Sequence, residues 1–355
     1  MTMISELPEN LLEEILFRIP ARSIKRLRST CKRWKRLFKD KRFTISHFDK
    51  APKQFLSFML SESRLSLMHN NLHRFSPVKV TSELNLIDSH SGFDQIGIRQ
   101  VFQCDGLLLC LTNESKTRIV VWNPCTGQTR WINHYKLDTT YALGSYQDKK
   151  SNDVSYKILA CSCRGYVEQQ EFNIFEMNSY SWKILDVPLD FQLNVFHYGV
   201  SLKGKTYWIS RDEKEPSKML LVTKIFERQS LPRKDSSYRT LSLSVFREEK
   251  LSVLSQCKVT SKIEIWVTNK FTETKTVSWS KVLPVDLDPG SEVWPGGSFL
   301  FDEEKKVLVC CDGLQYNKKA TVYIFGEDNE VRKVDFKVES YLPYLFNYVP
   351  SLIQF

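Results

Sequence analysis

Apolar residues recur at helical spacing through about the first forty residues of the chain. In the first half of this stretch they fall at i, i+1, i+4, i+5 and i+8, which places them on one face of a helix. Pro8 suits the first turn of such a helix, and Pro20 should end it. We therefore predict helices at residues 8–18, 21–29 and 31–39. The apolar positions are Leu11, Leu12, Ile15, Leu16, Ile19, Ile24, Leu27, Cys31, Trp34 and Phe38.

This stretch is too short to bury so much apolar surface against itself. Chains below about 40 residues rarely fold without a disulfide, a metal ion or a partner. We therefore expect the apolar face to be covered either by the rest of the chain or by a second protein.

From about residue 54 the pattern changes to short β-branched and aromatic runs separated by turn residues. Pairs of such runs begin near residues 55, 119, 172, 219, 262 and 321, and most are preceded by another pair. Four strands in each repeat of about 40–50 residues is the pattern of a β-propeller blade. The repeats predict a propeller of six blades, with seven as the alternative.

Several spaced motifs in the N-terminal stretch resemble an F-box of the form found in plants. They are Leu7-Pro8, Leu11-Leu12 with Ile15-Leu16, Arg18-Ile19-Pro20, Ser23-Ile24 and Cys31-Lys32-x-Trp34. The chain departs from the usual pattern at Asn10, Ile19 and Thr30. The resemblance implies an F-box module that binds the SKP-type adaptor of a cullin-RING ubiquitin ligase. The residues it implies for that contact are Leu7, Pro8, Leu11, Ile15, Leu16, Ile19, Pro20, Leu27, Cys31, Lys32 and Trp34.

The rest of the chain resembles the F-box-associated domain of plant F-box proteins, a kelch-like propeller. The motifs are Val121-Trp122-Asn123-Pro124, Ser181-Trp182-Lys183, Ile265-Trp266-Val267 with Ser278-Trp279, and the segment 348–352. We therefore predict an α+β multidomain chain, with a small three-helix F-box over residues 1–48 and an all-β propeller over residues 49–355. The resemblance implies the substrate-recognition subunit of an SCF-type (SKP–cullin–F-box) E3 ubiquitin ligase. Such a subunit is a non-catalytic adaptor whose propeller binds a protein substrate, here unknown, for ubiquitination.

The net charge of +10 is concentrated near the N-terminus. Residues 1–48 carry 12 Lys or Arg against 5 Asp or Glu, whereas the remaining 307 residues carry 39 against 36. Local positive charge of this kind should attract an acidic partner. Nucleic acid is the alternative partner, because three short basic helices could imitate a helix-turn-helix. Against it, the third helix would present Trp34, Leu37 and Phe38, which do not suit the reading of bases.

The composition points away from secretion and membranes. Early acidic residues interrupt any signal peptide, and no apolar run is long enough to cross a bilayer. The nine cysteines are odd in number and lack zinc or disulfide spacing. We therefore expect reduced thiols and a location in the cytoplasm, the nucleus or both.

No catalytic or phosphate-binding motif occurs in the sequence. We expect no catalytic residues, no cofactor and no metal site, and an enzyme ranks third among the alternatives. His69 and His73 have the spacing of a helical metal pair but lie in an Asn-rich turn. Cys104-Asp105-Gly106 and Cys311-Asp312-Gly313 repeat each other, and Asp-Gly predicts a tight turn in two blades.

Three long polar segments are the candidates for binding the substrate, because binding residues often lie on loops held by a rigid scaffold. They cover residues 134–155, 211–217 and 284–297. The side chains that we select from them are Tyr141, Tyr146, Arg211 and Trp294.

Overall fold

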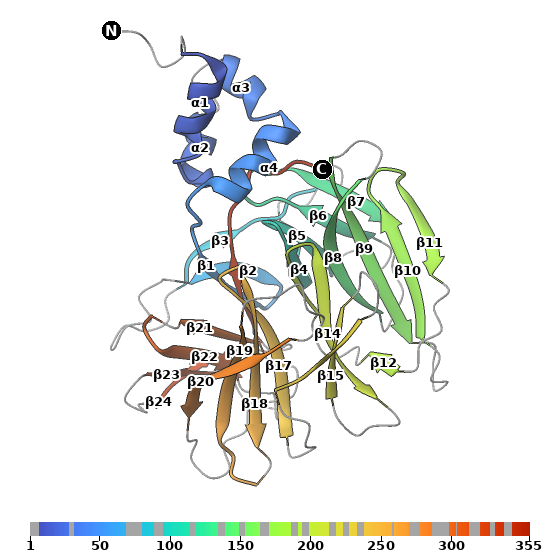
Figure 1. Cartoon of the computed structure of the whole chain (residues 1–355), viewed down its shortest axis with the longest axis vertical. Helices are drawn as coiled ribbons and strands as arrows, with labels where there is room; N and C mark the ends of the chain where they lie inside the picture. The colour runs from blue at the N-terminus through green and yellow to red at the C-terminus, as the bar shows by residue number, and fades with distance from the viewer. Residues whose placement is uncertain are drawn as a thin grey trace.

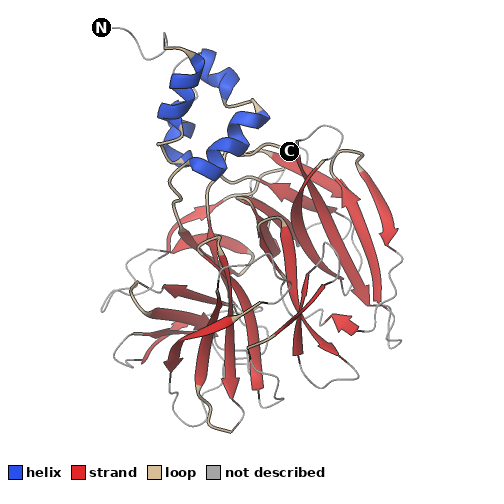
Figure 2. Cartoon of the chain, viewed as in Figure 1, coloured by secondary structure: helices blue, strands red, loops and turns tan. Residues whose placement is uncertain are grey.

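Four helices gather at one end of the molecule and β-sheets form the rest of it, as the computed structural model shows in Figures 1 and 2. The helices are α1 (Glu9–Leu16), α2 (Ala21–Leu27), α3 (Lys32–Leu37) and α4 (Lys41–Lys50). The structure describes residues 7–27, 32–68, 80–88, 95–113, 118–133, 139–148, 153–163, 170–185, 191–193, 199–212, 218–222, 227–232, 238–257, 259–269, 277–285, 298–302, 304–311, 320–326, 331–336 and 343–355.

The prediction of three helices is wrong in number, because α4 follows the three expected ones. Asp40 caps α4, and its side chain accepts a hydrogen bond of 2.8 Å from the backbone N–H of Arg42. The buried face of α4 consists of Phe43, Thr44 and His47. Two of these three residues are polar, so the apolar pattern alone did not indicate the helix.

The four helices bury or half-bury much of the apolar face that we expected to need a cover. One cluster joins residues of all four helices to two residues of the β part, Cys125 and Leu352. Of the two covers that the sequence left open, the chain itself supplies one for this part of the face, while Leu11 and Ile15 stay exposed. The helical members of the cluster are Leu12, Leu16, Phe17, Ala21, Ile24, Leu37, Phe38 and Phe43.

The described strands form six antiparallel sheets. The first contains β25 (Tyr344–Tyr348), β1 (Leu56–Ser61), β2 (Arg64–Met68) and β3 (Val80–Leu84), and the second contains β4 (Ile98–Cys104), β5 (Leu107–Thr112), β6 (Arg118–Trp122) and β7 (Thr129–Asn133). The third contains β8 (Thr139–Gln147), β9 (Val154–Cys163), β10 (Gln170–Glu176) and β11 (Ser181–Leu185).

The fourth sheet contains β12 (Phe191–Leu193), β13 (Val200–Leu202), β14 (Lys205–Asp212), β15 (Lys218–Val222) and β16 (Glu227–Ser230). The fifth contains β17 (Tyr238–Phe246), β18 (Lys250–Cys257), β19 (Ile263–Thr268) and β20 (Trp279–Val285). The sixth contains β21 (Phe299–Asp302), β22 (Val307–Cys311), β23 (Ala320–Phe325) and β24 (Val331–Phe336). Each of the six hairpins expected from the sequence lies in a different sheet.

The first sheet is completed by the C-terminal strand, because β25 pairs antiparallel with β1. The two ends of the β part are therefore joined by backbone hydrogen bonds, which leaves β1 without a free inner edge.

The tight turn predicted at Asp105-Gly106 is confirmed. It joins β4 to β5, and the two residues have φ angles of 51° and 74°. Positive φ at both central residues is the requirement of a type I′ hairpin turn, which Asp-Gly satisfies. In the matching motif Cys311 ends β22, while Asp312 and Gly313 lie outside the described residues.

Candidate functional site

The face of α1 that points away from the helical core carries two large exposed apolar side chains. Leu11 is 49% exposed and Ile15, one turn later, is 41% exposed. Leu12 and Leu16 lie beside them on the adjoining flank of the helix, and both are buried. Pro8 is also exposed and directly precedes α1. Leu11, Ile15 and Pro8 form the α1 surface, the apolar patch of the helical part that faces solvent.

The other residues selected for the adaptor contact separate into several groups. Leu16 is 1% exposed, so its burial argues for a place in the helical core rather than a direct contact with a partner. Lys32 is exposed on α3, and Cys31 lies outside the described residues. The half-buried residues, most of which contact the helical core, are Leu7, Ile19, Pro20, Leu27 and Trp34.

Two polar contacts hold the α1 surface in place. The Arg33 guanidinium on α3 donates a hydrogen bond of 2.7 Å to the backbone carbonyl of Leu7, just before α1. The Nε2 atom of His47 on α4 lies 2.8 Å from the carbonyl oxygen of Ile19, just after α1, and therefore donates to it. Neither residue was selected from the sequence, because neither contact follows from helical spacing.

His47 is buried among aromatic rings. Its ring centroid lies 5.9 Å from that of Phe43 and 6.4 Å from that of Phe17. Burial lowers the pKa of His47 below its usual value, and the positive charge of Lys53 lowers it further. The hydrogen bond to Ile19 acts in the opposite direction. The imidazole is therefore neutral at pH 7, with the proton on Nε2.

The helical part that carries the α1 surface is rich in exposed basic side chains. Exposed lysines and arginines lie on or beside all four helices, and the acidic side chains of α1 are fewer. The exposed cations are Arg18, Arg22, Lys25, Arg26, Lys32, Lys35, Arg36, Lys39, Lys41, Arg42 and Lys50. The exposed part of the helical module thus combines a small apolar patch with strong positive charge.

The residues selected for the substrate do not form one site in the described structure. Tyr141 is 0% exposed in β8, so its prediction as an exposed loop residue is wrong. Tyr146 lies in the same strand, half-buried, with the Lys157 ammonium 4.2 Å from its ring centroid. The backbone of Arg211 pairs with Gln192 and Lys218 within the fourth sheet. Trp294, like most of the segment 284–297, lies outside the described residues.

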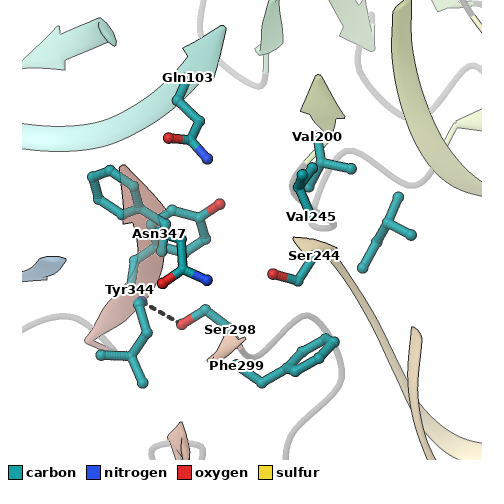
Figure 3. Close-up of a pocket in the computed structure, with 12 residues that line it drawn as sticks. Gln103, Val200, Ser244, Val245, Ser298, Phe299, Tyr344 and Asn347 are labelled. Atoms are coloured by element: carbon teal, nitrogen blue, oxygen red, sulfur yellow. Dashed lines mark hydrogen bonds between the residues drawn. The ribbon is translucent and has the colours of Figure 1, made fainter. Parts of the chain in front are cut away.

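A small cavity lies among the inner strands of several sheets (Figure 3). Gln103, Ser244, Ser298 and Asn347 point toward it from β4, β17, β21 and β25, or from residues next to them. Ser298 also accepts a hydrogen bond of 2.6 Å from the backbone N–H of Leu345. The cavity volume is about 20 Å³, enough for one water molecule and too small for an organic ligand.

Among the described residues, no three His, Cys, Asp or Glu side chains come together as a metal site. His69 and His73 lie outside that set. None of the described helices is long and apolar enough to span a bilayer. In the described part of the chain seven cysteines form no disulfide bond, and six of them are buried.

Two family models match the chain in the same order as the two parts of the structure. An F-box domain matches residues 4–46, and an F-box associated beta propeller domain matches residues 56–355. The chain belongs to the F-box proteins that carry an F-box-associated propeller. The boundaries that we predicted, 48 and 49, fall in the interval between the two matched ranges.

Proteins of Arabidopsis thaliana are similar to this F-box protein over nearly its whole length. The probable F-box protein At5g47300 is 54% identical over 99% of the chain and 87% of that protein. The F-box/kelch-repeat protein At3g44120 is 42% identical over 98% of the chain and 96% of that protein. Among solved structures, TolB from Acinetobacter baumannii matches with a TM-score of 0.46 and 12% identity, covering 82% of this chain and 66% of TolB.

Proposed function

We propose that this F-box protein is the substrate-recognition subunit of an SCF-type E3 ubiquitin ligase, with the α1 surface bound to a SKP-type adaptor. The observation that carries the proposal is the exposure of Leu11 and Ile15 on a helix whose other apolar residues are buried. Large apolar side chains next to each other on a surface mark a protein contact. The exposed cations of the same helical part favour an acidic partner and speed its encounter.

In this proposal the chain contributes no catalytic group. The adaptor links it to a cullin-RING ligase, and the six sheets act as the blades of one propeller that binds a protein substrate. Holding the substrate beside a charged ubiquitin-conjugating enzyme raises its effective concentration there. The complex would work in the cytoplasm, the nucleus or both.

The test is the affinity of the full-length chain for a purified SKP-type adaptor, measured by calorimetry. We expect the double variant Leu11→Asp/Ile15→Asp to bind at least roughly tenfold more weakly, because charges replace two apolar contacts. The matched control is Ile184→Asp, which changes an exposed apolar residue on β11, far from the helices in Figure 1. Circular dichroism should show that both variants are folded.

Unchanged affinity of a folded double variant would contradict the assignment of the α1 surface. A salt titration with double-stranded DNA addresses the rival function, for which the exposed cations are the only support. Phosphate binding loses affinity steeply as salt rises. Tight, salt-sensitive DNA binding together with no adaptor binding would favour a nucleic-acid-binding protein.

A further inference from the structure

The last seven residues of the chain, 349–355, run from the end of β25 toward the helices. We call this segment the C-terminal strap. Figure 1 shows its end beside α4 and the second sheet. It forms no helix or strand, yet Val349, Ser351, Leu352 and Ile353 are all buried. A terminal segment without secondary structure is usually exposed and poorly ordered unless something holds it.

Asn123 holds the strap to the second sheet. Its side-chain N–H groups donate to the carbonyl oxygens of Ser351 and Ile353, at 3.2 Å and 2.9 Å. Its side-chain oxygen accepts from the backbone N–H groups of Cys125 and Thr126, at 2.8 Å and 3.1 Å. Asn123 is 0% exposed, so each of these hydrogen bonds replaces water that cannot reach it. One buried amide thus fixes both the turn after β6 and the strap.

The same strap contacts the F-box. Leu352 belongs to the apolar cluster of the four helices, together with Cys125 from the turn that Asn123 forms. Gln354 donates a hydrogen bond of 2.7 Å to the carbonyl oxygen of Phe38, directly after α3. Carbonyl groups at the end of a helix have no partner within the helix, so Gln354 supplies one.

The covalent connection between the F-box and the propeller is made by a segment other than the strap. Residues 51–55 link α4 to β1, and Lys53 lies in this linker with its ammonium 3.5 Å from the centroid of the Phe48 ring. Lys53 also interacts electrostatically with Glu248 and Asp105, at the turns of the fifth and second sheets. Phe48 near the end of α4 also packs against the core of the second and third sheets. Phe48 and the linker are neighbours in the chain, so contacts through a second, separate segment should restrict rotation of the F-box further.

The strap and its neighbours are tightly fitted. Gly106 has a φ angle of 74°, and a Cβ atom there would lie 2.5 Å from the carbonyl oxygen of Val349 and 2.6 Å from the Ser351 hydroxyl. Tyr348 donates a hydrogen bond of 3.0 Å to the carbonyl oxygen of Gly106. The turn at Asp105-Gly106 therefore forms part of the surface on which the strap packs.

We propose that the C-terminal strap fixes the orientation of the F-box on the propeller, with Asn123 and Leu352 as the positioning residues on its two sides. Its consequence for ubiquitin transfer rests on the proposed function, because a fixed orientation sets where the bound substrate lies relative to the ligase. Misplacement by a small distance can reduce the rate of a proximity-driven reaction strongly.

The first measurement is the distance distribution between the F-box and the propeller in the full chain. Spin labels on non-canonical residues at Ser23 and Val259, both exposed, avoid the nine cysteines. The wild-type chain should give one narrow distribution. Leu352→Ala/Gln354→Ala removes the contacts of the strap with the F-box, and Asn123→Asp removes its two donated bonds while keeping the turn. Both should broaden the distribution.

The control is Asn113→Asp, the same substitution at an exposed residue directly after β5, whose side-chain N–H group donates to the Ser63 hydroxyl. It should leave the distribution narrow. If Asn123→Asp fails to fold, the double variant decides the outcome, since it leaves Asn123 intact. Narrow distributions in the folded strap variants would overturn the proposal.

The second measurement is ubiquitin transfer to lysines of the propeller itself in the assembled ligase, because the protein substrate is unknown. The double variant should lose about tenfold in rate at unchanged adaptor affinity. An unchanged transfer rate would refute the positioning role in the ligase. Failure of the wild-type chain to bind the adaptor would refute the proposed function instead. The distance measurement would still test whether the strap fixes the orientation of the F-box.

Discussion

Leu16 and Leu11 lie on one helix and match the same family pattern, yet the structure predicts opposite consequences for their loss. Leu16 is 1% exposed inside the helical cluster, whereas Leu11 is 49% exposed. We expect Leu16→Ala to destabilise the F-box and Leu11→Ala to weaken adaptor binding without affecting its stability.

The expected magnitude for Leu16 follows from its burial. Truncating a fully buried leucine costs about 2–5 kcal/mol of the free energy of unfolding. Domains carry only about 0.05–0.15 kcal/mol per residue, so the 43 residues matched by the F-box model carry roughly 2–6 kcal/mol of their own. Leu16→Ala should therefore bring the helices close to unfolding, unless the strap and the linker add stability. Leu11→Ala should stay within about 0.5 kcal/mol, as surface substitutions do.

Amide hydrogen exchange of the full-length chain separates the two cases, because it reports the helices and the sheets individually. In Leu16→Ala, exchange should accelerate throughout α1–α4 and remain unchanged in the sheets distant from the helices. Leu11→Ala should keep the wild-type exchange pattern. If Leu16→Ala retained full protection of the helices but lost adaptor binding, Leu16 would be a contact residue and the argument from burial would be wrong.

Three further predictions concern single positions. Because burial lowers the pKa of His47, the unfolded state binds a proton on this residue more readily than the folded state does. The stability of the F-box should therefore fall as the pH drops below about 6.5. Thermal unfolding at pH 7.5 and at pH 5.5 tests this, and His47→Gln should reduce the difference in stability between the two pH values. Gly106→Ala should cost about 1–3 kcal/mol in denaturant unfolding, since φ is positive and the strap occupies the space. Gly199→Ala should broaden or shift the fluorescence spectrum of the buried Trp208, because the new methyl group would meet the indole ring. An unchanged spectrum and stability would argue against close packing of Gly199 on Trp208.

The sequence was most informative where structure is local. The six hairpins were predictable because each consists of two adjacent apolar runs and a turn, and the type I′ turn at Asp105-Gly106 follows from two residues. The pairing of β25 with β1 was not predicted. It joins residues nearly the whole length of the chain apart, and no periodicity within either strand indicates its partner.

Two errors have the same physical origin, which is that polar residues can be buried. Tyr141 was assigned to a loop because it falls in the long polar segment 134–155. In the structure it lies in β8, among the strands that pack the second sheet against the third. In α4, His47 and Thr44 are buried where an apolar pattern would require aliphatic residues.

Helical spacing identified the apolar face of α1 but could not divide it. The apolar stripe formed by Leu11, Leu12, Ile15 and Leu16 is too wide for a single contact. The spacing is the same whether Leu12 and Leu16 are covered or Leu11 and Ile15 are. What decides the division is the position of α2, α3 and α4, together with Cys125 and Leu352 from the β part. Only the tertiary structure shows that Leu12 and Leu16 are buried while Leu11 and Ile15 stay exposed.

The same reasoning explains why two motifs far apart in the sequence belong together. The Trp122-Asn123-Pro124 motif and the segment 348–352 carried the propeller resemblance as separate signals, yet Asn123 bonds Ser351 directly. A buried amide that serves a turn and a distant strap cannot be replaced without leaving unsatisfied groups at both, which costs about 1–3 kcal/mol for each group. The strap in turn reaches Phe38 in the F-box. Hydrogen bonds at the two ends of the strap thus connect Asn123 in the second sheet to Phe38 in the F-box. A substitution at Asn123 should therefore change the structure of both parts of the molecule.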